Sequence, residues 1–181
     1  LATEAAARGI FMNSGQVCAA GSRLFVHEKL HDKVVQGVID HARKIKVGPG
    51  VDPTNAMGPL VSAEQRRRVM SYIESGAGEG AQVLTGGHAL DGAGYFVEPP
   101  VLGNTTASMR VRREEIFGPV LCAMSFGDAD IDALARLGLL GREGPDRPDG
   151  RERLLGLVAR LGQRVLVLLG QGADLPAVED R

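Results

Sequence analysis

The chain has 181 residues, 44% hydrophobic and 24% charged, a composition that excludes a collagen-like, membrane-spanning or disordered polypeptide. Lysine and arginine total 21 and aspartate and glutamate 22, a net charge of -1, so no basic field would attract nucleic acid or an anionic membrane. The two cysteines, Cys18 and Cys122, are too few for a disulfide framework, and we find no secretory leader. We therefore expect one globular domain in a reducing, cytoplasmic setting, with no nucleic-acid or membrane partner.

Hydrophobic spacing predicts three helices in the first part of the chain. The first covers residues 1–12. Between residues 28 and 47 apolar side chains recur every three or four positions, which predicts an amphipathic helix that ends before Pro49. The third should begin after Ser62, an N-cap residue with Gln65 as its capping-box partner, and should end in the glycine-rich stretch 76–80.

Short apolar runs between glycine and proline signals predict strands. They fall at residues 23–27, 82–85, 95–98 and 120–126. Strands that alternate with helices of this length favour an α/β fold with a parallel sheet and crossover connections.

The composition changes after Phe126, which divides the chain into a segment 1–126 and an atypical tail 127–181. The tail uses only ten residue types, with no aromatic residue, lysine, serine or threonine. One interpretation is a GC-rich gene read in a shifted frame from about codon 127. The other is an appendage with helices at 131–140 and 154–161, a linker at 141–150 and a strand at 164–169.

Cys18 lies in a turn of small residues between a predicted helix and a predicted strand, in the sequence Gly15-Gln16-Val17-Cys18-Ala19-Ala20-Gly21. A thiol becomes a nucleophile as its thiolate, which partial exposure and nearby backbone N–H groups favour. Small neighbours would also let a substrate approach the sulfur. The alternative from physics alone is a buried, inert cysteine, because free cysteines are commonly buried. Cys122, within an apolar strand, is expected in the core.

A second candidate is the segment 112–120, where charged residues give way to Glu115, Phe117 and a Gly-Pro turn. A carboxylate and an aromatic ring two positions apart share one side of an extended segment, where they could hold a ribose hydroxyl and a flat ring. An exposed glutamate and a core phenylalanine are the simpler alternative. The histidines have no ligand spacing with the cysteines or one another, so no metal is expected.

Taken together, these segments resemble the NAD(P)-dependent aldehyde dehydrogenases. The resemblance covers about residues 5–126: the Cys18 turn and Glu114-Glu115-Ile116-Phe117-Gly118-Pro119-Val120 occur in order, with 47–50 and 58–62 between them. It implies that Cys18 is the catalytic nucleophile and that Glu115 and Phe117 contact the nicotinamide ribose and the nicotinamide of NAD or NADP. Gln65 and Arg68 match weaker cofactor-side positions.

The implied reaction oxidises a small-molecule aldehyde to a carboxylic acid. The thiolate attacks the carbonyl to give a thiohemiacetal, hydride passes to NAD(P), and water hydrolyses the resulting thioester. The fold implied is the parallel-sheet catalytic domain of that family.

The chain also departs from the family pattern. The dinucleotide-binding domain, the general-base glutamate and the oxyanion asparagine would precede residue 5, and the closing motifs and oligomerisation strand have no counterpart in 127–181. We therefore expect an incomplete catalytic domain. Members of the family are homo-oligomers, but the oligomerisation strand is not recognisable in this chain. The alternative function is a non-catalytic fragment that serves as an assembly or binding module.

Overall fold

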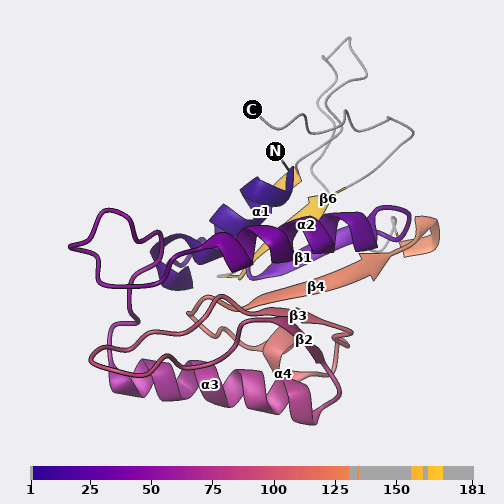
Figure 1. Cartoon of the computed structure of the whole chain (residues 1–181). Helices are drawn as coiled ribbons and strands as arrows, with labels where there is room; N and C mark the ends of the chain where they lie inside the picture. Colours follow the sequence, from indigo (N-terminus) through magenta and orange to yellow (C-terminus); the bar gives the residue numbers. More distant parts are fainter. Residues whose placement is uncertain (1, 131–133, 135–155, 161–162, 169–181) are drawn as a thin grey trace.

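The computed structural model describes residues 2–130, 134, 156–160 and 163–168 (Figure 1). Its helices are α1 (Ala2–Phe11), α2 (His31–Lys44), α3 (Ala63–Gly78) and α4 (Arg110–Arg113), with 3₁₀ turns η1 (Met12–Gly15) and η2 (Asp128–Asp130). The three predicted helices are confirmed, whereas α4 was not predicted because four residues carry no periodic signal. In this part of the chain, no helix is long and apolar enough to span a bilayer.

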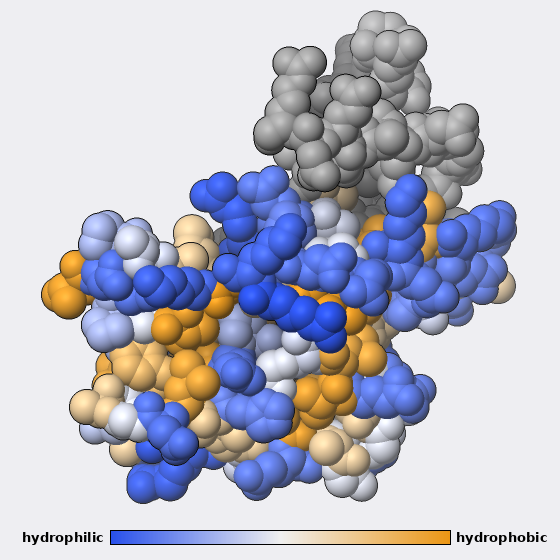
Figure 2. Space-filling view, in the orientation of Figure 1, coloured by the Kyte–Doolittle hydropathy of each residue, from blue (hydrophilic) through white to orange (hydrophobic). Residues whose placement is uncertain are grey.

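The helix boundaries follow from local chemistry. The Ser62 hydroxyl accepts a hydrogen bond from the Gln65 N–H at 3.1 Å and caps α3 as predicted. The other bond of the predicted capping box, from the Gln65 side chain back to Ser62, is wrong, because the Gln65 side chain bonds residues 116 and 117 instead. On α2 the charged residues are exposed and the apolar ones are buried, and Figure 2 shows a hydrophilic band over this helix with apolar residues gathered below it.

A single mixed sheet forms the centre of the molecule. The strands are β1 (Arg23–His27), β2 (Gln82–Thr85), β3 (Val101–Gly103), β4 (Leu121–Phe126), β5 (Gly156–Arg160) and β6 (Gln163–Leu168), in the order β2-β3-β4-β1-β6-β5. The four inner strands are mutually parallel, and the edge strands β2 and β5 pair antiparallel. The predicted α/β class with a parallel sheet is confirmed.

Some predicted elements are wrong. Residues 95–98 form only an isolated bridge between Ala89 and Val97, because Pro99 and Pro100, which follow directly, have no N–H to continue a ladder. The described part of 154–161 is strand β5 rather than a helix, while the strand expected at 164–169 is present as β6. The strand β3 was missed because it has only three residues. Apart from residue 134, the helix expected at 131–140 and the linker at 141–150 lie outside the described residues, and the boundary after Phe126 stays a prediction.

The two faces of the sheet bury separate apolar clusters, each covered by its own helices (Figure 1). Consecutive residues of β4 alternate between them: Leu121 and Ala123 pack with α1 and α2, whereas Cys122 and Met124 pack with α3. This alternation is the two-residue period of a strand buried on both sides.

The register of the sheet decides where the candidate site lies. β1 and β4 are adjacent and parallel, with Arg23 opposite Cys122, and the Cys122 N–H donates to the Ser22 carbonyl at 2.9 Å. The segments that lead into these two strands therefore meet at the same end of the sheet. These are the Cys18 turn, before β1, and residues 115–120, before β4.

Candidate active site

The Cys18 turn begins with a left-handed reversal of the chain after α1. Asn13, Ser14 and Gly15 have φ values of 53°, 55° and 66°, which ends the helix. The Ala20 N–H then bonds the Val17 carbonyl at 2.8 Å and closes a tight turn around Cys18. The Cys18 side chain is exposed, so the expectation of an accessible thiol is confirmed and the buried alternative is wrong.

Gly15 is the point at which this turn touches the second candidate segment. A Cβ at this position would lie 2.8 Å from the Pro119 nitrogen and closer still to the Gly118 carbonyl group. Real side chains do not tolerate such an approach to backbone, and the positive φ also favours glycine. Gly15 therefore allows the backbones of the two segments to come into direct contact.

A loop after Met57 holds the turn from the other side. The buried Ser14 hydroxyl donates to the Gly58 carbonyl at 2.8 Å. The Gln16 side chain accepts from the Val61 N–H at 2.9 Å and donates to the Pro59 carbonyl at 3.4 Å. These bonds join two of the segments that carry the family resemblance, although the chain separates them by more than 40 positions.

Cys18, Glu115 and Phe117 line one pocket, together with Ile10, Ile116, Gly118 and other residues of the 15–22 turn. The pocket is shallow and open to solvent. The Glu115 side chain is exposed and makes no hydrogen bond or ion pair with any described residue, and Phe117 is 37% exposed. The fold thus brings all three predicted site residues together, while their roles stay predictions.

Glu115 and Phe117 both line this pocket, with the buried Ile116 between them, but the segment is not extended at Phe117. Phe117 has a φ of 58°, so the backbone turns sharply before the Gly118-Pro119 pair. Phe117 accordingly lies partly exposed beside the pocket instead of entering the core.

Cys122 provides a contrast with Cys18 within the same chain. Its side chain is 1% exposed and its thiol lies 3.7 Å from the Val111 carbonyl oxygen. Burial raises the pKa of the Cys122 thiol to about 12, because a thiolate would lose its hydration there. The expected core role of Cys122 is confirmed.

Helix α3 holds the backbone of residues 115–117. The Gln65 side-chain amide donates to the carbonyls of Ile116 and Phe117 at 3.0 and 2.8 Å. The Arg68 guanidinium donates to the Glu115 carbonyl at 2.8 Å. Arg68 forms no ion pair with a carboxylate among the described residues, and both side chains bond the main chain of this segment.

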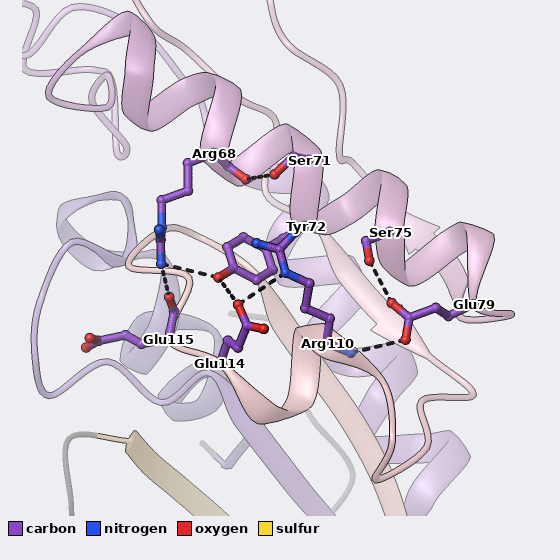
Figure 3. A network of polar contacts seen from close by, with 8 residues as sticks. All are labelled: Arg68, Ser71, Tyr72, Ser75, Glu79, Arg110, Glu114 and Glu115. Atoms are coloured by element: carbon purple, nitrogen blue, oxygen red, sulfur yellow. Dashed lines mark hydrogen bonds and ion pairs between the residues drawn. The ribbon is translucent and has the colours of Figure 1, made fainter.

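A second group of polar contacts lies directly behind this segment (Figure 3). The buried Tyr72 hydroxyl donates to Glu114 at 2.7 Å and accepts from Arg68 at 3.2 Å. The Arg110 guanidinium lies 4.1 Å from the Tyr72 ring centroid and donates from Nε to the same Glu114 oxygen at 3.1 Å. The Tyr72 hydrogen bond, followed by that of Arg110, lowers the pKa of Glu114. Burial, and then the bond to Glu114, raises the pKa of Tyr72.

The sequence reasoning did not single out Tyr72, Glu114 or Arg110. The only local signal was the spacing of Arg68 and Tyr72, four residues apart on one helix face. Nothing in the sequence pairs Tyr72 with Glu114, 42 positions later. In the part of the chain that the structure describes, no group of three or more histidine, cysteine, aspartate or glutamate side chains is placed to hold a metal ion.

The site thus combines an exposed thiol, a carboxylate and an aromatic side chain around one pocket of a parallel α/β fold. The family model described as "Aldehyde dehydrogenase family" matches residues 1–136. The chain belongs to the aldehyde dehydrogenase family.

Individual relatives agree with this assignment. The chain is 47% identical over 129 residues to a mitochondrial aldehyde dehydrogenase of Leishmania tarentolae and 44% identical over 132 residues to a betaine aldehyde dehydrogenase of Brucella anthropi. It is similar to an NAD+ complex of aldehyde dehydrogenase from Bacillus cereus, with a TM-score of 0.70 and 42% identity. These matches cover 71–74% of this chain but only 26–27% of the relatives, so the chain spans a minor part of their length.

Proposed function

We propose that this chain carries the nucleophile and the nicotinamide-side contacts of an NAD(P)-dependent aldehyde oxidation. The observation that supports the proposal is the single pocket lined by the exposed Cys18, by Glu115 and by Phe117. Family membership supplies the class of substrate, an aldehyde.

The reaction would begin at Cys18. Its thiolate attacks the aldehyde carbon, a carbon–sulfur bond forms, and the carbonyl oxygen becomes the oxyanion of a thiohemiacetal. The N–H groups of Cys18 and Ala19 donate no hydrogen bond to any described residue, so they are available to stabilise this oxyanion. After loss of hydride from the former carbonyl carbon, a thioester remains on the Cys18 sulfur. Its hydrolysis releases the carboxylic acid and frees the thiol.

Glu115 and Phe117, which line the same pocket, fit the nicotinamide end of a dinucleotide. The Glu115 carboxylate has no partner among the described residues and can accept hydrogen bonds from ribose hydroxyls. The Phe117 side chain is partly exposed beside the pocket and can contact a flat heteroaromatic ring. NAD(P), when bound, would supply the hydride acceptor.

The proposal is tested first at the covalent step, which needs only this chain and an aldehyde. The protein is mixed with an aldehyde labelled with ¹³C at the carbonyl, and the spectrum is searched for the sp³ carbon of a thiohemiacetal. We expect this signal from the wild type and from Cys122→Ala, which lacks the buried thiol, and we expect none from Cys18→Ala. A signal that survives in Cys18→Ala, or its absence from the wild type, would refute the nucleophile assignment.

The cofactor contacts are tested by titrating NAD+ into the wild type, Glu115→Gln and Glu64→Gln, and following line broadening of the nicotinamide protons. Glu64 is exposed in the first turn of α3 and does not line the pocket. We expect weaker broadening with Glu115→Gln and unchanged broadening with Glu64→Gln. Equal broadening with all three proteins, or none with the wild type, would contradict the proposed cofactor role and favour an assembly or binding module.

A further inference from the structure

The wall of the Cys18 pocket formed by residues 115–118 has little structure of its own. It belongs to no helix or strand. Phe117 adopts a positive φ of 58°, a backbone conformation that residues other than glycine rarely take. Such a backbone persists only when its surroundings hold it. The side chains that hold it here come from α3.

The bond from Arg68 to the Glu115 carbonyl depends on where the Arg68 guanidinium is held. Arg68 is an exposed, flexible side chain, and its Nη2 atom bonds both the Tyr72 hydroxyl at 3.2 Å and the Glu115 carbonyl at 2.8 Å. Its guanidinium also lies 5.3 Å from the Tyr72 ring centroid. The Tyr72 side chain is fully buried, so its hydroxyl offers a fixed point to an otherwise mobile cation.

Tyr72 acts on the same segment by a second route. Its hydroxyl donates to Glu114, the residue before Glu115, and Arg110 bonds the same carboxylate. Figure 3 shows that the Glu114 side chain points towards Tyr72 and Arg110, whereas the neighbouring Glu115 carboxylate points away from them. Glu114 thus takes up Tyr72 and Arg110, while the Glu115 carboxylate has no partner among the described residues.

We propose that Tyr72 is a positioning residue, which acts through Arg68 and Glu114 to hold the backbone of residues 115–117 in place as part of the Cys18 pocket. Its importance for catalysis rests on the proposed function above. The positioning itself is a property of the unliganded chain and can be measured without turnover.

The test compares Tyr72→Phe, which removes only the hydroxyl, with Tyr95→Phe as a matched control. Tyr95 is partly exposed and does not line the Cys18 pocket, and its hydroxyl makes no hydrogen bond with any described residue. Backbone ¹⁵N relaxation at residues 115–118 reports the order of the wall, and the rate of iodoacetamide reaction at Cys18 reports access to the thiol. We expect Tyr72→Phe to lower the order of residues 115–118 and to change the Cys18 rate by about 2- to 10-fold, the range for loss of one hydrogen bond. Tyr95→Phe should change neither.

A double-mutant cycle separates positioning from a general loss of stability. If Tyr72 acts through Arg68, Arg68→Ala should itself lower the order of the wall, and adding Tyr72→Phe to Arg68→Ala should have a clearly smaller effect than Tyr72→Phe alone. Ile73→Val, a buried change on α3 outside the group, controls for stability. Unchanged relaxation in Tyr72→Phe, a fully additive cycle, or an equal loss of order in Ile73→Val would each overturn the proposal. Failure of the aldehyde-adduct test with these results intact would overturn only the proposed function.

Discussion

Replacement of Gly15 by alanine tests whether direct backbone contact holds the candidate site together. Gly15 has a φ of 66°, and a Cβ there would meet the Gly118 carbonyl group and the Pro119 nitrogen. The left-handed conformation costs alanine about 1 kcal/mol. The added carbon must also push apart two backbone segments, and overpacking of this kind costs about 1–3 kcal/mol.

We therefore expect Gly15→Ala to lower the free energy of unfolding by about 2–4 kcal/mol, a large part of the stability of a typical domain. Urea denaturation followed by circular dichroism measures this change. The pocket should deform as well, because Gly15 and Gly118 both line it, so the rate of iodoacetamide reaction at Cys18 should differ from that of the wild type.

Gly9 provides the matched control. It lies within α1, and a Cβ there would meet no atom within 4 Å. Gly9→Ala should therefore raise stability by about 0.5–1 kcal/mol, the helix preference of alanine over glycine. If Gly15→Ala loses less than about 0.5 kcal/mol, or if both variants change stability in the same direction, the reasoning about this contact is wrong.

Two further predictions concern titration and helix capping. The pKa of the Cys122 thiol is about 12 in the folded chain, above the reference thiol value of 9.0. Ionisation of this thiol in the unfolded chain should therefore lower the free energy of unfolding as the pH rises from 9 towards 12. Urea titrations of Cys122→Ala should show a smaller decline, and pH profiles identical to those of the wild type would contradict the burial of an ionisable thiol. Ser62→Ala should lower the free energy of unfolding by about 1 kcal/mol because it removes the N-cap of α3. Ser71→Ala, which removes a hydroxyl bonded to the carbonyl three residues earlier in the same helix, should cost clearly less, and equal losses in denaturation would argue against capping.

Periodicity identified the longer elements because burial of one helix face, or of both faces of a strand, requires a regular pattern of apolar residues in the sequence. It placed α2, α3, β1, β2 and β4. It failed for β3 and α4, which are too short for a period, and for 95–98, where the apolar residues pack in a loop and form only one bridge. The strand β5 was missed because a short apolar run in a helical pattern and in a buried strand look alike.

The sequence alone determined the α/β class, the small-residue turn around Cys18, the burial of Cys122 and the family, because each depends on residue types at fixed local spacing. Only the tertiary structure decided that Cys18 and Glu115, 97 positions apart in the numbering, line one pocket. The physical reason is the register of β1 against β4, which brings the segments that lead into these two parallel strands to the same end of the sheet. The Tyr72 and Arg68 contacts to the pocket wall likewise depend on helix α3 packing against one face of the sheet, and no local pattern encodes this packing.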